Sequence, residues 1–257
     1  MSLSIRYKRQ AAFPGLGENG QALLGAAKVA IVGCGGLGST LASCMARAGV
    51  GNLTIIDRDS PDISNLHRQF LFDTSDVEKG ANKALAATEK LRRVNPEIKI
   101  CGLPERLSKK NCDKLLAGND LVLDGTDNFE TRYIINDWCL KNKVPWIYGG
   151  VDSSIGMTMV IKAVKGPCFR CLFPSRVAED RPSDDPQRGI INTVPVVIAS
   201  FQATEAFKLL TQSNDVIENL RIIDLWSGEF RTVQIERNPV CPCCSSEPSN
   251  MNTLPDK

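Results

Sequence analysis

Residues 28–59 read KVAIVGCGGLGSTLASCMARAGVGNLTIIDRD, and their pattern sets the fold class. The apolar run at 28–32 predicts a strand, the glycines after it a tight turn, and the small and apolar residues through about Ala48 a helix. A second strand is predicted at 53–56, ending at Asp57. Strand, helix and strand in this order form a βαβ unit, so we expect parallel strands joined by a right-handed crossover.

Strand and helix signals continue to alternate as far as residue 150. The predicted elements are a helix within 80–96, strands within 98–104 and 120–128, a helix at 129–143 and a strand within 144–150. Asn95-Pro96 supplies the stop for the first of these helices. The alternation predicts an α/β fold with a Rossmann-like, mainly parallel sheet and helices on both faces.

The pattern changes after Gly150. We expect an antiparallel strand within 156–164, a polar loop at 174–189, an apolar helix at 196–210 and a hairpin within 220–237. The fold would thus continue into an antiparallel, β-rich C-terminal half. We predict one domain over 1–244, with halves of about 25–150 and 151–244, and a disordered polar tail at 245–257.

Composition excludes several classes of function. The net charge is +2 for 257 residues, so no strong field favours nucleic acid or an anionic membrane as a partner. No apolar run approaches the roughly 20 residues that span a bilayer. The first residues, MSLSIRYKRQ, lack the apolar core of a signal peptide, so we expect a cytoplasmic protein.

The glycine turn predicts a nucleotide site. Its motif is G-x-G-x-x-G, placed after a strand and at the start of a helix, and it consists of Gly33, Gly35, Gly36 and Gly38. Without side chains, the backbone N–H groups can approach a phosphate at the helix N-terminus. Asp57 lies where an acid accepts hydrogen bonds from ribose hydroxyls. The motif indicates an adenine nucleotide without saying which one.

Three further stretches favour ATP over NAD. SNLHRQF supplies Asn65 and Arg68, EKGANKAL supplies Lys83, and DGTDN supplies Asp127 and Asn128 after a strand. Two cations suit a triphosphate, and a carboxylate suits Mg²⁺. An NAD-dependent oxidoreductase remains the alternative, but the only histidine, His67, is interpreted as a surface or packed imidazole rather than a catalytic group.

The ten cysteines fall into two groups. Five stand singly and are interpreted as small buried hydrophobes: Cys34, Cys44, Cys101, Cys112 and Cys139. Cys168 and Cys171 form one C-x-x-C pair, and Cys241 and Cys244 form another with Cys243 between them. Two such pairs favour a structural Zn²⁺ site over a redox pair or coincident buried thiols.

Taken in order, several motifs resemble those of the MoeB/ThiF/HesA family, bacterial and archaeal relatives of ubiquitin-activating enzymes. They are RYKRQ, VGCGGLGS, LTIIDRDSPDISNLHRQF, KGANKA, DGTDN, GPCFRC, QATEAFKLL and CPCC, running from about Arg6 to Cys244. The resemblance implies adenylation of the C-terminal glycine of a small ubiquitin-like sulfur-carrier protein ending in Gly-Gly. It further implies ATP and Mg²⁺ as cofactors, release of pyrophosphate, and a homodimer with one Zn²⁺ per subunit.

The resemblance also assigns roles to residues of this chain. Gly36 and its neighbours would hold phosphate, and Asp57 the ribose. The triphosphate would be bound by Asn65, Arg68 and Lys83. Asp127, with Asn128 beside it, would hold Mg²⁺ near the attacking carboxylate. Arg9 would reach the γ-phosphate of the ATP bound to the partner subunit.

One position departs from the family pattern. Many members carry a reactive cysteine where this chain has Gln187, and no cysteine stands between Cys171 and Cys241. We therefore expect adenylation without covalent transfer, with sulfur supplied by a donor protein. Molybdopterin, thiamine and related pathways remain open. So does another peptide or carrier C-terminus as the substrate. A non-catalytic adaptor that keeps only the docking surface is disfavoured, because every expected nucleotide residue is present.

Overall fold

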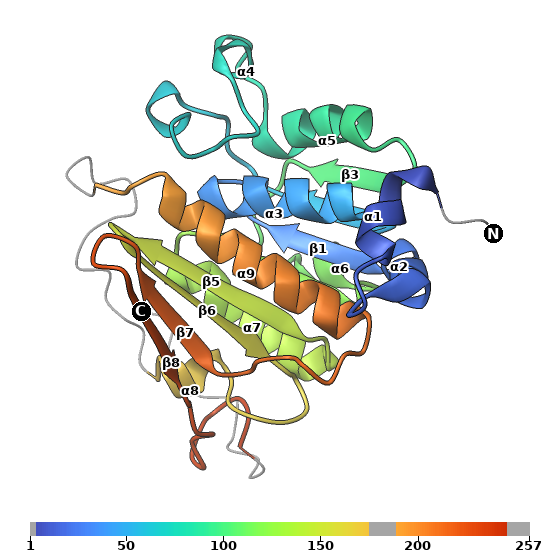
Figure 1. The fold of residues 1–257 in the computed structure, drawn as a ribbon. Coiled ribbons are helices and arrows are strands. Elements are labelled where there is room, and N and C mark those ends of the chain that lie inside the picture. The colour runs from blue at the N-terminus through green and yellow to red at the C-terminus, as the bar shows by residue number, and fades with distance from the viewer. Residues whose placement is uncertain (1–3, 175–188, 246–257) are drawn as a thin grey trace.

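The computed structural model describes residues 4–174 and 189–245 (Figure 1). Its strands form one eight-stranded sheet in the order β3-β2-β1-β4-β5-β6-β7-β8. The strand bounds are β1 Lys28–Val32, β2 Asn52–Ile56, β3 Lys99–Leu103, β4 Leu121–Asp124, β5 Trp146–Asp152, β6 Ile155–Ile161, β7 Leu220–Asp224 and β8 Glu229–Val233. The predicted fold is confirmed, from its parallel strands to its antiparallel C-terminal ones.

Helices pack on both faces of this sheet (Figure 1). The longer ones are α2 Gly17–Ala26, α3 Gly36–Ala48, α5 Lys83–Val94, α7 Phe129–Asn142 and α9 Thr193–Leu210. The short ones are η1 Ile5–Tyr7, α1 Lys8–Ala11, η2 Ile63–Asn65, α4 Thr74–Glu78, α6 Cys112–Leu116 and α8 Phe169–Leu172. No helix among the described residues is both long and apolar enough to cross a bilayer.

Strand order places the ligand crevice. β1 pairs in parallel with β2 on one side and with β4 on the other. After β1 the chain adds β2 and β3 on one side of the sheet and then crosses over to add β4 on the other side. In open α/β sheets, ligands bind outside the carboxyl ends of the strands at such a switch point. Those ends are Val32, which leads into the glycine turn, and Asp124, which leads into the DGTDN segment.

The second half of the sheet is antiparallel. β5 pairs with β6, β6 with β7, and β7 with β8 through the tight connection that contains Gly228, whose φ is +76°. The α9 helix packs against α3 and against β5 and β6, so it spans the junction between the parallel and antiparallel parts (Figure 1). The predicted hairpin and apolar helix are both confirmed.

The N-terminal helices had no clear signal in the sequence. Both α1 and α2 close the C-terminal end of α3, where Gln10 and Gln21 each donate a side-chain hydrogen bond to the carbonyl oxygen of Ala48 at 2.9 Å. The α1 helix has only 4 residues and α2 contains three glycines, so neither helix would be stable alone, and tertiary contacts hold both in place. The polar loop of 174–189 and the tail of 245–257 lie mostly outside the described residues.

Candidate nucleotide site and metal centre

The glycine turn joins β1 to α3, and its glycines have no side chains that would shield the backbone. Gly33 has φ +85°, and a Cβ atom there would lie 2.6 Å from the carbonyl oxygen of Gly125. Gly35 is the N-cap of α3, and Gly36 is its first residue. The first N–H groups of an α-helix have no partner within the helix. The turn therefore presents backbone donors and the positive end of the helix dipole, a combination that binds phosphate.

Asp57, at the end of β2, ties this turn to the next loop. Its Oδ2 accepts a hydrogen bond from the N–H of Cys34 at 2.6 Å, and its Oδ1 accepts one from the N–H of Asp59 at 2.8 Å. Burial raises the pKa of Asp57, and the nearby charge of Lys83 opposes that rise. Each carboxylate oxygen can accept a second hydrogen bond, so the group can still bind ribose hydroxyls.

Lys83 is placed by the start of α5. Its backbone N–H donates to the carbonyl oxygen of Asp59 at 2.8 Å, while the N-cap residue Asn82 donates Nδ2 to the carbonyl oxygen of Asp57 at 3.0 Å. Lys83 is only 8% exposed, and no carboxylate of the described residues lies within ion-pair distance of its ammonium group. A cation held this way can bind an added anion.

Arg68 follows η2, and Asp127 follows β4. Burial lowers the pKa of the half-buried Arg68, and the charge of Asp127 counteracts that effect. Asp127 is exposed, and Asn128 donates Nδ2 to its Oδ1 at 3.3 Å. Asn128 also caps α7, because its Oδ1 accepts a hydrogen bond from the N–H of Thr131 at 2.9 Å.

Asn65 ends η2 and is half-buried, and its carbonyl oxygen accepts the N–H groups of Arg68 and Gln69 at 3.1 Å. This turn orients Arg68. His67 is exposed, and its Nδ1 lies 2.9 Å from the carbonyl oxygen of Ser64, as the interpretation of a surface imidazole predicts.

Arg9 does not join the other residues within this chain. It is exposed on α1, and the neighbouring Gln10 binds the C-terminal end of α3. The glycine turn lies at the opposite end of that helix, which is about 20 Å long at 1.5 Å per residue. A role for Arg9 in the nucleotide site of a partner subunit stays a prediction.

Sequence reasoning missed two parts of this region. Gln69 is 4% exposed, its Oε1 has no hydrogen-bond partner among the described residues, and its Nε2 lies 3.7 Å from where a Cβ on Gly35 would stand. Asp124, the first residue of the DGTDN segment, forms a buried ion pair with Arg132 of α7. The only sequence signal for these residues was their position, because Gln69 follows Arg68 directly and Asp124 lies shortly before Asp127.

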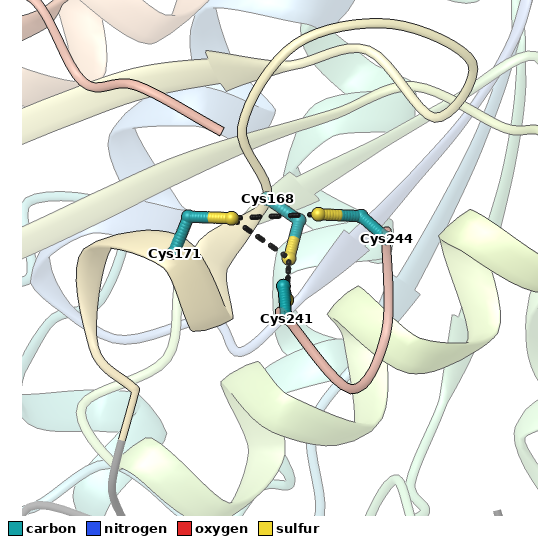
Figure 2. A group of neighbouring side chains, drawn as sticks. All are labelled: Cys168, Cys171, Cys241 and Cys244. Atoms are coloured by element: carbon teal, nitrogen blue, oxygen red, sulfur yellow. Dashed lines mark hydrogen bonds between the residues drawn. The ribbon is translucent and has the colours of Figure 1, made fainter. Parts of the chain in front are cut away.

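The four predicted zinc ligands meet in one cluster (Figure 2). The sulfur atoms of Cys168, Cys171, Cys241 and Cys244 all lie within 4.8 Å of one another. Cys168 Sγ lies 4.0 Å from Cys171 Sγ and 3.6 Å from Cys241 Sγ, and Cys171 Sγ lies 3.4 Å from Cys244 Sγ. Tetrahedral zinc with Zn–S bonds of about 2.3 Å separates its thiolates by about 3.8 Å. The cluster therefore fits a zinc ion.

The chemistry of the cluster agrees with its geometry. Burial raises the pKa of Cys244 to about 11, and a bound cation would favour the thiolate form of this residue. Cys243 takes no part in the cluster, and its Sγ donates a hydrogen bond to Asp137 Oδ1 at 3.2 Å. Arg170 forms an ion pair with the same carboxylate at 2.7 Å, which fixes α8 to α7.

The five single cysteines behave differently from one another. Cys34 and Cys139 are buried, as expected, whereas Cys44 and Cys112 are partly exposed. The interpretation of Cys101 as a buried hydrophobe is wrong, because its side chain is exposed. It stands on β3, a strand at the edge of the sheet, and its side chain points away from the core. Gln187 lies outside the described residues.

Comparison with known proteins identifies the family. The model of the ThiF family matches residues 7–243. A sulfur carrier protein adenylyltransferase from Thermus thermophilus is 36% identical over 250 residues, covering 95% of this chain and 92% of that protein. A sulfur carrier protein ThiS adenylyltransferase from Bacillus subtilis is 36% identical over 244 residues, covering 94% and 72%.

Solved structures agree at the level of the fold. The crystal structure of Escherichia coli MccB with MccA-N7isoASN superimposes with a TM-score of 0.82 at 24% sequence identity, covering 96% of this chain and 76% of that one. Its parallel and antiparallel strands thus belong to an architecture already known. The family model, which spans nearly every described residue, and the relatives from Thermus and Bacillus establish that the chain belongs to the ThiF family.

Proposed function

We propose that this chain adenylates the C-terminal glycine carboxylate of a small ubiquitin-like sulfur-carrier protein ending in Gly-Gly. The observation that carries the proposal is the packing of the glycine turn against two predicted ligand segments. A Cβ on Gly33 would lie 2.6 Å from the carbonyl oxygen of Gly125 in DGTDN, and a Cβ on Gly36 would lie 3.4 Å from the carbonyl oxygen of Arg68. The names of the Thermus and Bacillus relatives support the choice of a sulfur carrier as the substrate.

The reaction joins two negatively charged groups. A carboxylate oxygen of the carrier attacks the α-phosphorus of ATP, the bond from that phosphorus to the bridging oxygen breaks, and pyrophosphate leaves. Arg68 and Lys83 offset charge on the phosphates and thereby lower the barrier. The attacking group is already ionised, so no general base is needed.

Cofactor roles follow from the donor set. Mg²⁺ prefers oxygen ligands, and Asp127 with Asn128 would hold it beside the triphosphate. The backbone of Gly35 and Gly36 would bind phosphate, and Asp57 the ribose. Zn²⁺ held by the four clustered cysteines would be structural, because four thiolates leave no open coordination position.

The proposal includes a homodimer. Arg9 is exposed and distant from its own glycine turn, which suits an arginine that enters the nucleotide site of a second copy. Mixing Arg9→Ala subunits with Arg68→Ala subunits tests this arrangement, because the hybrid dimers regain one complete site. Recovery of exchange on mixing is expected. Failure to recover, although hybrid dimers form, contradicts the role in trans.

The direct test is ATP–pyrophosphate exchange with a panel of purified carriers. ThiS-like and MoaD-like proteins ending in Gly-Gly are compared with versions truncated by the last two residues. We expect exchange only with an intact carrier, and the preferred carrier separates thiamine from molybdopterin biosynthesis. Exchange with an unrelated peptide C-terminus would replace the carrier by another substrate.

Two further outcomes decide between classes of protein. Exchange that persists with no carrier present contradicts carrier activation. Tight binding of NADH without binding of ATP favours an oxidoreductase instead, and binding of a carrier without any exchange favours an adaptor. We also expect a cytoplasmic protein without nucleic-acid or membrane partners. A separate donor protein would supply the sulfur.

A further inference from the structure

A buried ion pair lies at the start of the segment that carries Asp127. Arg132 on α7 and Asp124 at the end of β4 are 5% and 0% exposed, and Arg132 Nε lies 3.0 Å from Asp124 Oδ2. Removing each charge from water is costly, and apolar pairs of similar volume often stabilise a fold equally well. Stability alone does not explain why this pair is charged.

The bonds that the pair makes give a better reason. Arg132 Nη2 donates to the carbonyl oxygens of Thr126 at 2.7 Å and Gly149 at 3.1 Å. Asp124 Oδ1 accepts hydrogen bonds from the backbone N–H of Thr126 at 2.9 Å and from its hydroxyl at 2.6 Å. The peptide groups on both sides of Thr126 are therefore fixed, one by the arginine and one by the aspartate.

The guanidinium group is itself fixed in orientation. Its carbon lies 5.6 Å from the centre of the Phe129 ring and 5.3 Å from that of Tyr148. The planar guanidinium group binds the carboxylate through Nε and both carbonyl oxygens through Nη2. The compact ammonium group of lysine does not have this geometry. The identity of the residue as arginine is thus part of the geometry.

Asp127 depends on this geometry. Its side chain is exposed, and the hydrogen bond from Asn128 is long at 3.3 Å. Side-chain packing therefore contributes little to its position, which is set by the backbone between Asp124 and Asn128. A metal ligand has to be held close to its productive geometry to be effective.

We propose that Asp124, Thr126 and Arg132 are positioning residues that hold this turn so that the carboxylate of Asp127 can bind the magnesium ion of the nucleotide. The inference rests on the proposed function, because it assigns Asp127 to the metal. None of the three residues needs to touch the ligand. Their effect is transmitted through the backbone of the turn.

Thr126→Val tests the proposal with little change in volume. It removes the hydroxyl bond to Asp124 but leaves the ion pair, and Thr126→Ser is the matched control that keeps the hydroxyl. The probe is Mn²⁺, followed by electron paramagnetic resonance, with a non-hydrolysable ATP analogue. We expect Mn²⁺ to bind roughly tenfold more weakly in the valine variant, as for the loss of one charge-assisted hydrogen bond.

The serine variant should bind Mn²⁺ as the unmodified chain does, and metal-free affinity for the analogue should be the same in all three. Equal Mn²⁺ affinity in the valine variant overturns the inference alone. So does a matching loss of metal-free nucleotide affinity, which signals a general collapse of the site. If the unmodified chain binds no Mn²⁺ with the analogue, both the inference and the proposed function fail.

Arg132→Lys gives a second, independent measurement. It keeps the charge but loses the fork, so Mn²⁺ affinity should fall further than in Thr126→Val. Circular dichroism and thermal unfolding show whether the variant is folded. A folded Arg132→Lys protein with unchanged Mn²⁺ affinity also overturns the inference.

Discussion

A Cβ atom on Gly38 would lie 1.9 Å from the carbonyl oxygen of Gly33. The two ends of the glycine turn therefore touch, and no side chain fits between them. Such close approach of helix and strand keeps the first turn of α3 over the carboxyl end of β1.

Gly38→Ala should consequently destroy the nucleotide site. The methyl group must push α3 away from β1, so we expect loss of detectable ATP binding and a lower melting temperature. Calorimetric titration and thermal unfolding measure the two effects. Gly25→Ala on α2 is the matched control, because a Cβ there meets no atom within 4 Å. ATP binding by the Gly38 variant at normal affinity would contradict the assignment of the turn to phosphate.

Asp127→Ala should abolish carrier-dependent ATP–pyrophosphate exchange without affecting the fold, since the side chain is exposed. The physical reason is loss of the carboxylate that holds magnesium. Glu130→Gln, a nearby exposed acid paired with Arg106 at 2.9 Å, controls for a general change of charge. Near-normal exchange in the Asp127 variant would rule out the magnesium role.

Nucleotide affinity should depend on pH through Asp57. Burial raises the pKa of this carboxyl above its ordinary value of 3.8, so it is protonated at a higher pH than an exposed acid. A protonated Asp57 accepts ribose hydroxyls poorly, and ATP affinity should fall as pH falls through the raised pKa. Titration calorimetry between pH 4 and 7, roughly the range in which a raised carboxyl titrates, tests this. Asp57→Asn should bind weakly and lack that dependence.

The raised pKa of Asp57 changes folding stability with pH in the opposite direction to ATP affinity. The folded protein holds the Asp57 proton more tightly than the unfolded chain does, because burial disfavours the ionised form. The contribution of Asp57 to stability is therefore largest below the unfolded pKa and declines as pH rises through the folded one. A stability profile without this decline would show that the carboxyl is better solvated than its surroundings indicate.

The sequence predicts the nucleotide half well because its signals are local. Strand, glycine turn and helix follow one another within 28–59, so Gly33, Asp57 and α3 could be assigned from spacing alone. Arg132 and Gln69 could not. Both side chains matter because they are buried against other segments of the fold. No periodicity or motif in the sequence predicts that an arginine or a glutamine is buried. Cys101 illustrates the opposite error, in which an apolar neighbourhood in sequence does not lead to burial.

Zinc removal should affect the two halves unequally. With a chelator, hydrogen exchange should rise first in α8 and in the residues around Cys241, and later in β1 and α3. Cys171→Ser should reproduce this order, while Cys243→Ser, which removes the sulfur bound to Asp137, should retain the metal. Metal analysis of freshly purified protein that finds no zinc would refute the assignment.

Gln187→Ala should retain adenylation, since no covalent step is assigned to that position. Exchange rates within about twofold of the unmodified chain are expected, as for a substitution that removes no reacting group. Complete loss of exchange would show that the segment around Gln187 contributes to the chemistry itself.

The cysteine cluster also has a topological consequence. Cys168 and Cys241 are 73 positions apart in the chain, and the segment between them contains α9, which packs against α3 and β5. With the ion bound, the metal acts as a reversible cross-link that closes this segment into a ring. A chain cleaved once between Cys171 and Cys241 would consequently remain one particle, and its fragments would separate only after both denaturation and chelation.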